Sequence, residues 1–83
     1  MERAEIITRV KQVLKAHGRL GKDAVELEEN DDLYDAGMSS HASVEVMLSL
    51  EAEFDIEFPD EMLRREVFQT AGAVADAIEK LQA

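Results

Sequence analysis

Apolar residues recur at the spacing of an amphipathic α-helix in three separate stretches of the chain. The first stretch runs from about residue 3 to 16 and ends at Gly18. The second begins at Ser39 or Ser40, either of which can cap a helix, and ends near Phe54; the last follows another candidate cap, Thr70. No window shows strand-like alternation that helical spacing does not fit at least as well. These patterns predict an all-α fold with three longer helices.

A short additional helix is expected between the second long helix and the last one. Residues 55–58 form an extended link, after which Pro59 suits the first position of a helix and Asp60 and Glu61 suit its positive end. A long acidic loop occupies residues 19–37, and scattered apolar residues are expected to hold it against the core: Leu20, Val25, Leu27, Leu33 and Tyr34. The expected fold is a four-helix bundle with a short third helix and a long first loop.

Length and composition limit the chain to one small domain. With 83 residues, of which 46% are hydrophobic, we expect residues 1–83 to form a single monomeric domain with one modest core. No apolar stretch approaches a membrane span, and the first residues lack the apolar segment of a signal peptide, so we expect a soluble cytoplasmic protein. Cysteine is absent. Any thiol chemistry must therefore use a sulfur that is supplied from outside.

The negative charge is concentrated in the middle of the sequence. The formal net charge is -10, and no Lys or Arg occurs from Asp23 to Asp60. Such a surface repels nucleic acid and anionic membranes and attracts proteins that carry Lys and Arg. The alternative interpretation is that the acidity only keeps a small domain soluble.

The residues offer no recognisable catalytic or metal site. The chain lacks H-E-x-x-H and G-x-S-x-G motifs, and Ser40 and His41 are adjacent helical residues that face different ways. A calcium loop starting at Asp32 would place Ser43 where the bidentate Glu belongs. We therefore expect no catalytic residue and no bound metal.

A glycine turn leads into two serines at the predicted start of the second helix. Residues 37–45 read Gly-Met-Ser-Ser-His-Ala-Ser-Val-Glu. Exposed backbone N–H groups and the positive end of the helix dipole stabilise a phosphate carried on a side chain at such a position. Ordinary helix capping is by far the more common explanation of an isolated Gly-x-Ser-Ser. The motif alone therefore leaves both interpretations open.

The order of these segments resembles the acyl carrier protein superfamily over nearly the whole chain. The resemblance lies in residues 37–47, in residues 50–61, which look like the exit from helix two into a short helix three, and in residues 70–72, which look like the entry to helix four. Ser40 matches the family's modified serine, through alignment of the Val44-Glu45 pair that follows. The resemblance implies that a phosphopantetheinyl transferase attaches 4'-phosphopantetheine from coenzyme A covalently to Ser40.

Two positions depart from the common family pattern and indicate a narrower group. Ser39 replaces the usual Asp and His41 replaces the usual Leu, which makes the motif similar to that of stand-alone bacterial aminoacyl carrier proteins. Those proteins are loaded by ATP-dependent ligases similar to seryl-tRNA synthetases. The implied cargo is a small amino acid, such as glycine or alanine, held as a thioester for an acceptor enzyme that the sequence does not identify. The alternatives are a fatty-acyl or polyketide carrier and an unmodified helical interaction module.

Two sets of residues are assigned from their positions. Six apolar residues of the second and last helices are expected in the core: Val44, Met47, Leu50, Phe54, Val74 and Ile78. We expect ten residues to surround the modified serine and contact partner proteins: Asp35, Met38, Ser39, His41, Ala42, Glu45, Glu51, Glu53, Asp60 and Glu61. Among them, the side chains of Met38, His41 and Ala42 are expected to be exposed beside the serine.

Overall fold

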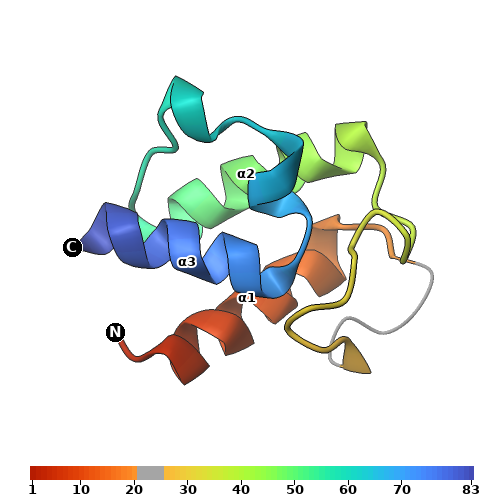
Figure 1. Cartoon of the computed structure of the whole chain (residues 1–83), viewed down its shortest axis with the longest axis horizontal. Helices are drawn as coiled ribbons and strands as arrows, with labels where there is room; N and C mark the ends of the chain where they lie inside the picture. Colours follow the sequence, from red (N-terminus) through yellow and green to blue (C-terminus); the bar gives the residue numbers. More distant parts are fainter. Residues whose placement is uncertain (21–25) are drawn as a thin grey trace.

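A computed structural model describes residues 1–20 and 26–83, and the regular structure within those ranges is helical (Figure 1). Three α-helices form the body of the molecule: α1 (Arg3–His17), α2 (Ser40–Phe54) and α3 (Ala71–Gln82). The three longer helices predicted from the sequence are confirmed, and the described residues contain no strand.

The predicted short third helix is absent as an α-helix, so the count of four helices is not confirmed. Two 3-10 helices stand in its place, η2 (Asp60–Met62) and η3 (Arg65–Phe68). Pro59 precedes the first of them, close to the predicted start, but Leu63 leaves helical geometry with φ -83° and ψ 62°. The rings of Phe58 and Phe68 meet edge to face with centroids 5.3 Å apart. This contact brings the two ends of the segment together, so residues 59–67 turn back on themselves and do not form one straight helix.

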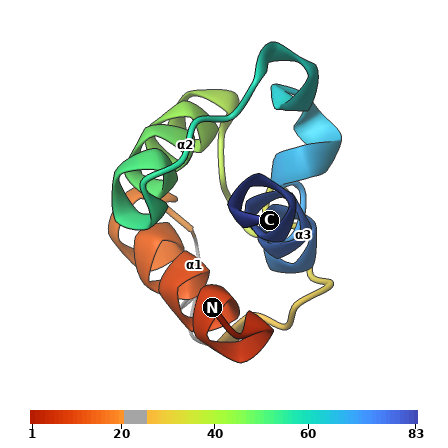
Figure 2. The same cartoon turned by 90° about the vertical axis from the view of Figure 1, so that its left-hand side faces the viewer.

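The core lies where α1 packs against both α2 and α3 (Figure 2). Its largest fully buried side chains include Ile6 and Leu14 from α1, Val46 and Leu50 from α2, and Val74 from α3. Removing these apolar side chains from water is the main favourable contribution to folding.

The predicted core residues divide between the inside and the outside of the fold. The prediction is confirmed for Leu50, Phe54, Val74 and Ile78, which are all at least 93% buried. Val44 is 51% exposed, so its assignment to the core is wrong, and Met47 is half-buried at the edge of the core. Helix α2 turns the face that holds Val46 and Leu50 inward, and this leaves Val44 on the opposite side.

The long first loop is held against the helices, as the sequence predicted. Leu27 and Leu33 are buried, while Leu20 and Tyr34 are half-buried against the core. The backbone N–H of Leu33 also donates to the carbonyl of Gln69 at 2.7 Å. Val25, which was predicted to do the same, lies outside the described residues.

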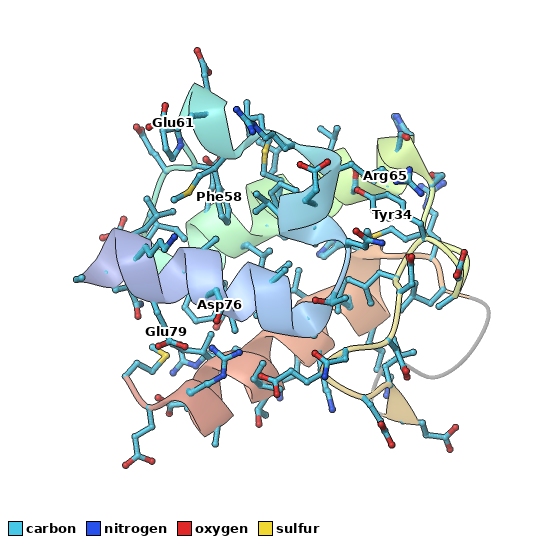
Figure 3. The ribbon with its side chains drawn as sticks, viewed as in Figure 1. Tyr34, Phe58, Glu61, Arg65, Asp76 and Glu79 are labelled. Carbon is cyan, nitrogen blue, oxygen red and sulfur yellow. The ribbon has the colours of Figure 1, made fainter. Side chains whose placement is uncertain are left out.

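Arg3 ties the beginning of α1 to α3 and to the loop. Its guanidinium pairs with Glu29, Asp76 and Glu79, and Figure 3 shows the last two reaching from α3 toward α1. Hydrogen bonds from Arg3 to Glu79, Asp76 and Glu29 raise the pKa of the guanidinium above its usual range. Among the described residues, no helix is long and apolar enough to cross a membrane.

Candidate modification site at the start of helix α2

The two adjacent serines at the start of α2 have different surroundings. Ser39 is the N-cap, with extended backbone angles, and its Oγ accepts a hydrogen bond from the N–H of Ala42 at 3.0 Å. Ser40 is the first residue of the helix and is exposed; its hydroxyl has no hydrogen-bond partner among the described residues. Gly37 directs the chain into this turn with φ 120°, a conformation that glycine adopts without steric cost. The turn therefore presents the hydroxyl of Ser40 to solvent.

The local electrostatics at Ser40 favour an anionic group. The first turn of α2 contains no acidic residue that would already compensate the positive end of the helix dipole. His41 lies beside the serine with its side chain 80% exposed, and its Nε2 is 3.4 Å from Oε1 of Glu45. Arg19 approaches the same oxygen at 3.5 Å. The exposure predicted for His41 is thus confirmed, and its nearest charged neighbour is Glu45.

The predicted exposure of two neighbours of the serine is wrong. Met38 is 2% exposed and Ala42 is fully buried. Ala42 shares the inward face of α2 with Val46 and Leu50, at four-residue spacing, and the N–H of Met38 donates to the carbonyl of Leu33 at 3.0 Å. Both side chains therefore fix the start of α2 on the core and are not available to a partner.

The predicted ring of acidic residues around Ser40 does not form. Asp35 and Glu45 lie near the start of α2, but Glu51 and Glu53 lie about 16 to 20 Å from Ser40 along the helix axis. Figure 3 shows Glu61 at the end of the molecule away from Tyr34. These distant acids form a second acidic region at the C-terminal end of α2, together with the exposed Asp60.

Two carboxylates of that distant region make contacts within the fold. Glu51 is half-buried, and its Oε2 accepts the backbone N–H of Phe58 at 2.9 Å, which holds the link after α2. Glu53 pairs with Arg9 of α1 at 3.3 Å. Both contacts stabilise the connection between secondary-structure elements.

A groove of about 400 Å³ opens beside Ser40, between α2 and the segment that contains η3. Its lining is mainly apolar, with the polar groups provided by two serines and two arginines: Tyr34, Ser40, Ser43, Val44, Met47, Leu63, Arg64, Arg65 and Phe68. This groove was not predicted from the sequence. The only signal was that Arg64 and Arg65 are the first basic residues after the long acidic stretch.

The guanidinium of Arg65 stacks on the ring of Tyr34 at the groove. The guanidinium carbon of Arg65 lies 3.9 Å from the centroid of the Tyr34 ring, and Figure 3 shows the two side chains together near the first turn of α2. Asp32 holds the backbone of Tyr34, accepting its N–H at 2.9 Å, and also accepts the side-chain amide of Gln69 at 2.9 Å. The hydrogen bond from Gln69, followed by that from the N–H of Asp35, lowers the pKa of Asp32.

Comparison with known proteins places this site in a family context. Residues 4–78 match the family model described as the phosphopantetheine attachment site. The chain is 41% identical over 69 residues to the aminoacyl carrier protein of Agrobacterium fabrum, covering 83% of each protein.

Two solved structures with related chains add a partner to the comparison. The carrier protein from Agrobacterium tumefaciens, crystallised with an engineered Bradyrhizobium japonicum glycine:carrier protein ligase and ATP, matches with a TM-score of 0.87 and 37% identity over 90% of this chain and 97% of that one. The glycylated carrier protein bound to the Bradyrhizobium japonicum ligase matches with a TM-score of 0.67 and 31% identity, covering 90% of this chain and 96% of the other.

Proposed function

This chain belongs to the phosphopantetheine attachment-site family, and we propose that it is an aminoacyl carrier protein modified on Ser40. The attached 4'-phosphopantetheine supplies the thiol that the protein itself lacks, and this thiol holds a small amino acid, such as glycine or alanine, as a thioester. The carrier delivers the amino acid to an acceptor enzyme. It has no catalytic step of its own.

The free hydroxyl of Ser40 is the observation that carries the proposal. Ser39 uses its oxygen to cap α2, whereas Ser40 is exposed and has no hydrogen-bond partner among the described residues. Loading forms a bond between Ser40 Oγ and the phosphorus of coenzyme A that bears the pantetheine, and it breaks the pyrophosphate bond. Adenosine 3',5'-bisphosphate leaves, and a base of the phosphopantetheinyl transferase takes the serine proton.

The amino acid cargo is supported by the relatives. One related protein is called an aminoacyl carrier protein, and another is glycylated in its complex with a glycine ligase. We propose that a ligase of this type, similar to a seryl-tRNA synthetase, activates the amino acid with ATP and transfers it to the thiol. A monomeric carrier in the cytoplasm, where coenzyme A and ATP are available, completes the proposal.

Intact-mass measurement tests the modification. Incubation with a phosphopantetheinyl transferase and coenzyme A should add the mass of one phosphopantetheine group to the wild type and to Ser39→Ala, but none to Ser40→Ala. A gain retained by Ser40→Ala and lost by Ser39→Ala would move the site to Ser39. No gain in any of the three would leave the chain as an unmodified helical interaction module.

The cargo is tested on the modified protein. With a glycine:carrier protein ligase, ATP and glycine, the mass should rise by one glycyl group, and mild hydroxylamine should release it as glycine hydroxamate. The control omits ATP. Recovery of only fatty-acyl chains from carrier isolated from its natural source would overturn the aminoacyl cargo and leave the acyl-carrier alternative.

A further inference from the structure

We infer that residues 29–34 of the first loop form a strap that holds the turn before Ser40 in place. Gly72 and Arg3 anchor this strap from outside it and are therefore positioning residues for the modification. The strap docks on residues 69–72, and Figure 1 shows this part of the loop passing beside the first turn of α3. The role toward Ser40 rests on the proposed function, whereas the docking is a property of the fold and is tested separately.

Leu33 joins the entries of two helices through its own backbone. Its N–H donates to the carbonyl of Gln69 at 2.7 Å, and its carbonyl accepts the N–H of Met38 at 3.0 Å. Gln69 lies just before α3, and Met38 directly precedes Ser39, the N-cap of α2. The side chain of Leu33 is fully buried. A displacement of Leu33 therefore moves the turn that leads into α2.

The other end of the strap docks on the first turn of α3. The carbonyl of Glu29 accepts the N–H of Gly72 at 2.9 Å. Backbone N–H groups in the first turn of a helix have no partner within the helix itself. The strap therefore satisfies one of these groups, while the hydroxyl oxygen of Thr70 accepts the N–H of Ala73.

Gly72 allows the strap to approach α3 closely. A Cβ at this position would lie 2.9 Å from Cγ of Glu29 and 3.2 Å from its carbonyl oxygen. Gly72 lies within α3 and does not have the positive φ that would favour glycine. Alanine forms helices more readily than glycine does. Glycine at this position thus serves packing against the strap and not the formation of the helix.

Arg3 holds the same end of the strap through charge. Its Nη2 lies 2.7 Å from Oε1 of Glu29, and the same guanidinium pairs with Asp76 and Glu79 of α3. Nη2 also donates to the carbonyl of Gly72 at 3.4 Å. Hydrogen bonds between ionised groups are stronger than those between neutral ones. Arg3 therefore ties the strap and α3 together at one point.

Release of the strap lowers the fraction of molecules in which the turn before Ser40 has its docked conformation. An enzyme that recognises the docked turn then meets fewer competent molecules, and its apparent affinity falls in proportion to that fraction. The chemical step on the bound carrier is unchanged. The strap therefore acts on KM for the modification of Ser40 and not on kcat.

Amide hydrogen exchange followed by nuclear magnetic resonance tests the docking. The N–H groups of Leu33 and Met38 are the reporters, since both are hydrogen-bonded through the strap and lie far along the chain from Gly72. In Gly72→Ala we expect both amides to exchange about tenfold faster, the scale of an overpacked contact. In Arg3→Gln the increase should be about threefold, as for the loss of exposed ion pairs. Amides in the middle of α1 and α2 should keep their wild-type rates.

The matched control for Arg3 is another arginine of α1. Arg9→Gln removes a side chain whose acidic partners, Glu5 and Glu53, lie outside the strap, and both reporter amides should exchange as in the wild type. Wild-type exchange of the reporters in Gly72→Ala would disprove the strap. Exchange of the reporters at the same rate as amides in the middle of α1 would also disprove it, because the loop would then open only when the whole domain unfolds.

Kinetics of the modification test the link to Ser40. With a phosphopantetheinyl transferase and coenzyme A, Gly72→Ala should raise KM for the carrier about threefold and leave kcat unchanged, which corresponds to about a third of the molecules docked. Arg9→Gln should change neither constant. A wild-type KM in Gly72→Ala would disprove the positioning role while the proposed function stands. If the wild type gains no mass at Ser40, the proposed function fails, and hydrogen exchange still decides whether the strap docks as a unit.

Discussion

Ser39 and Ser40 are chemically identical neighbours, and only their hydrogen bonds distinguish them. Because the Oγ of Ser39 accepts the N–H of Ala42, this residue has a structural role in capping α2. We expect Ser39→Ala to destabilise the fold by about 1 kcal/mol, which lowers Tm by about 4–8 °C in a domain of this size. Thermal unfolding followed by circular dichroism measures this change.

Substitutions with defined capping ability serve as controls for Ser39. Ser39→Asp supplies another good cap and should unfold near the wild-type Tm. Ser40→Ala removes a hydroxyl without a partner and should stay within about 0.5 kcal/mol of the wild type. A loss in Ser40→Ala as large as that in Ser39→Ala would contradict the division of roles between the two serines.

Asp32 makes the stability of the loop next to Ser40 depend on pH. Its pKa is lowered in the fold by Gln69 and by backbone N–H groups, relative to an ordinary value of 3.8. A carboxyl with a lowered folded pKa stabilises the fold above its unfolded pKa, and this contribution disappears as the pH falls through the folded pKa. We expect the wild type to exceed Asp32→Asn in Tm at pH 7, and the difference to shrink below pH 4.

Thermal unfolding of the wild type and of Asp32→Asn, measured between pH 7 and pH 2.5, gives the Tm values that test this prediction. Asp35→Asn, which changes an exposed acid in the same loop, is the matched control. Its Tm should stay parallel to that of the wild type over this range. A difference between wild type and Asp32→Asn that is constant with pH would show that ionisation of Asp32 contributes nothing.

At the scale of elements, the sequence predicts the helices well and their inward faces less well. The starts of α2 and α3 follow from capping chemistry at Ser39 and Thr70, which depends only on nearby residues. Helix α2 is apolar on two sides, because Ala42, Val46 and Leu50 share one face at four-residue spacing while Val44 and Leu48 share another. Periodicity alone cannot choose between two such faces, since only packing against α1 makes one of them the core.

The groove beside Ser40 could not be predicted from the sequence, for a related reason. Its parts come from the long loop, from α2 and from the 3-10 segment, and the Tyr34–Arg65 contact joins residues that are far apart in the chain. Local patterns report neighbours along one helix or strand, and they do not show which distant side chains meet. By contrast, a helix start at Ser39 or Ser40 was predictable because the turn and the capping residues are local, whereas the choice between the two serines was not.

The long loop is predicted to depend on Leu33 as an anchor. Leu33 is fully buried and its N–H bonds Gln69, so Leu33→Ala should cost about 2–5 kcal/mol of unfolding free energy. Leu63→Ala is the matched control, since Leu63 is 48% exposed and its truncation should change stability by less than about 0.5 kcal/mol. Urea unfolding followed by circular dichroism gives both values. Equal losses in the two variants would contradict the buried anchor.

At the scale of the whole molecule, electrostatic repulsion lowers the stability of the fold while local ion pairs raise it. The net charge of -10 lies on a body of only 32 × 25 × 20 Å, so the acidic groups repel one another across the fold. Ion pairs such as Arg3 with Asp76, at 2.8 Å, attract locally. Salt screens interactions beyond the Debye length, which falls from about 30 Å at 0.01 M to about 10 Å at 0.1 M, so it weakens the long-range repulsion more than the close pairs.

Salt is therefore predicted to stabilise this protein. Tm should rise between 0.01 M and 0.1 M NaCl at pH 7, measured by differential scanning calorimetry. Asp60→Asn/Glu61→Gln removes two exposed negative charges and should show a higher Tm at 0.01 M and a smaller rise with salt, because less repulsion remains to be screened. A Tm that falls with added salt would mean that the ion pairs around Arg3 and Arg9 outweigh the repulsion among the acidic groups. The excess of acidic residues would then not destabilise the fold.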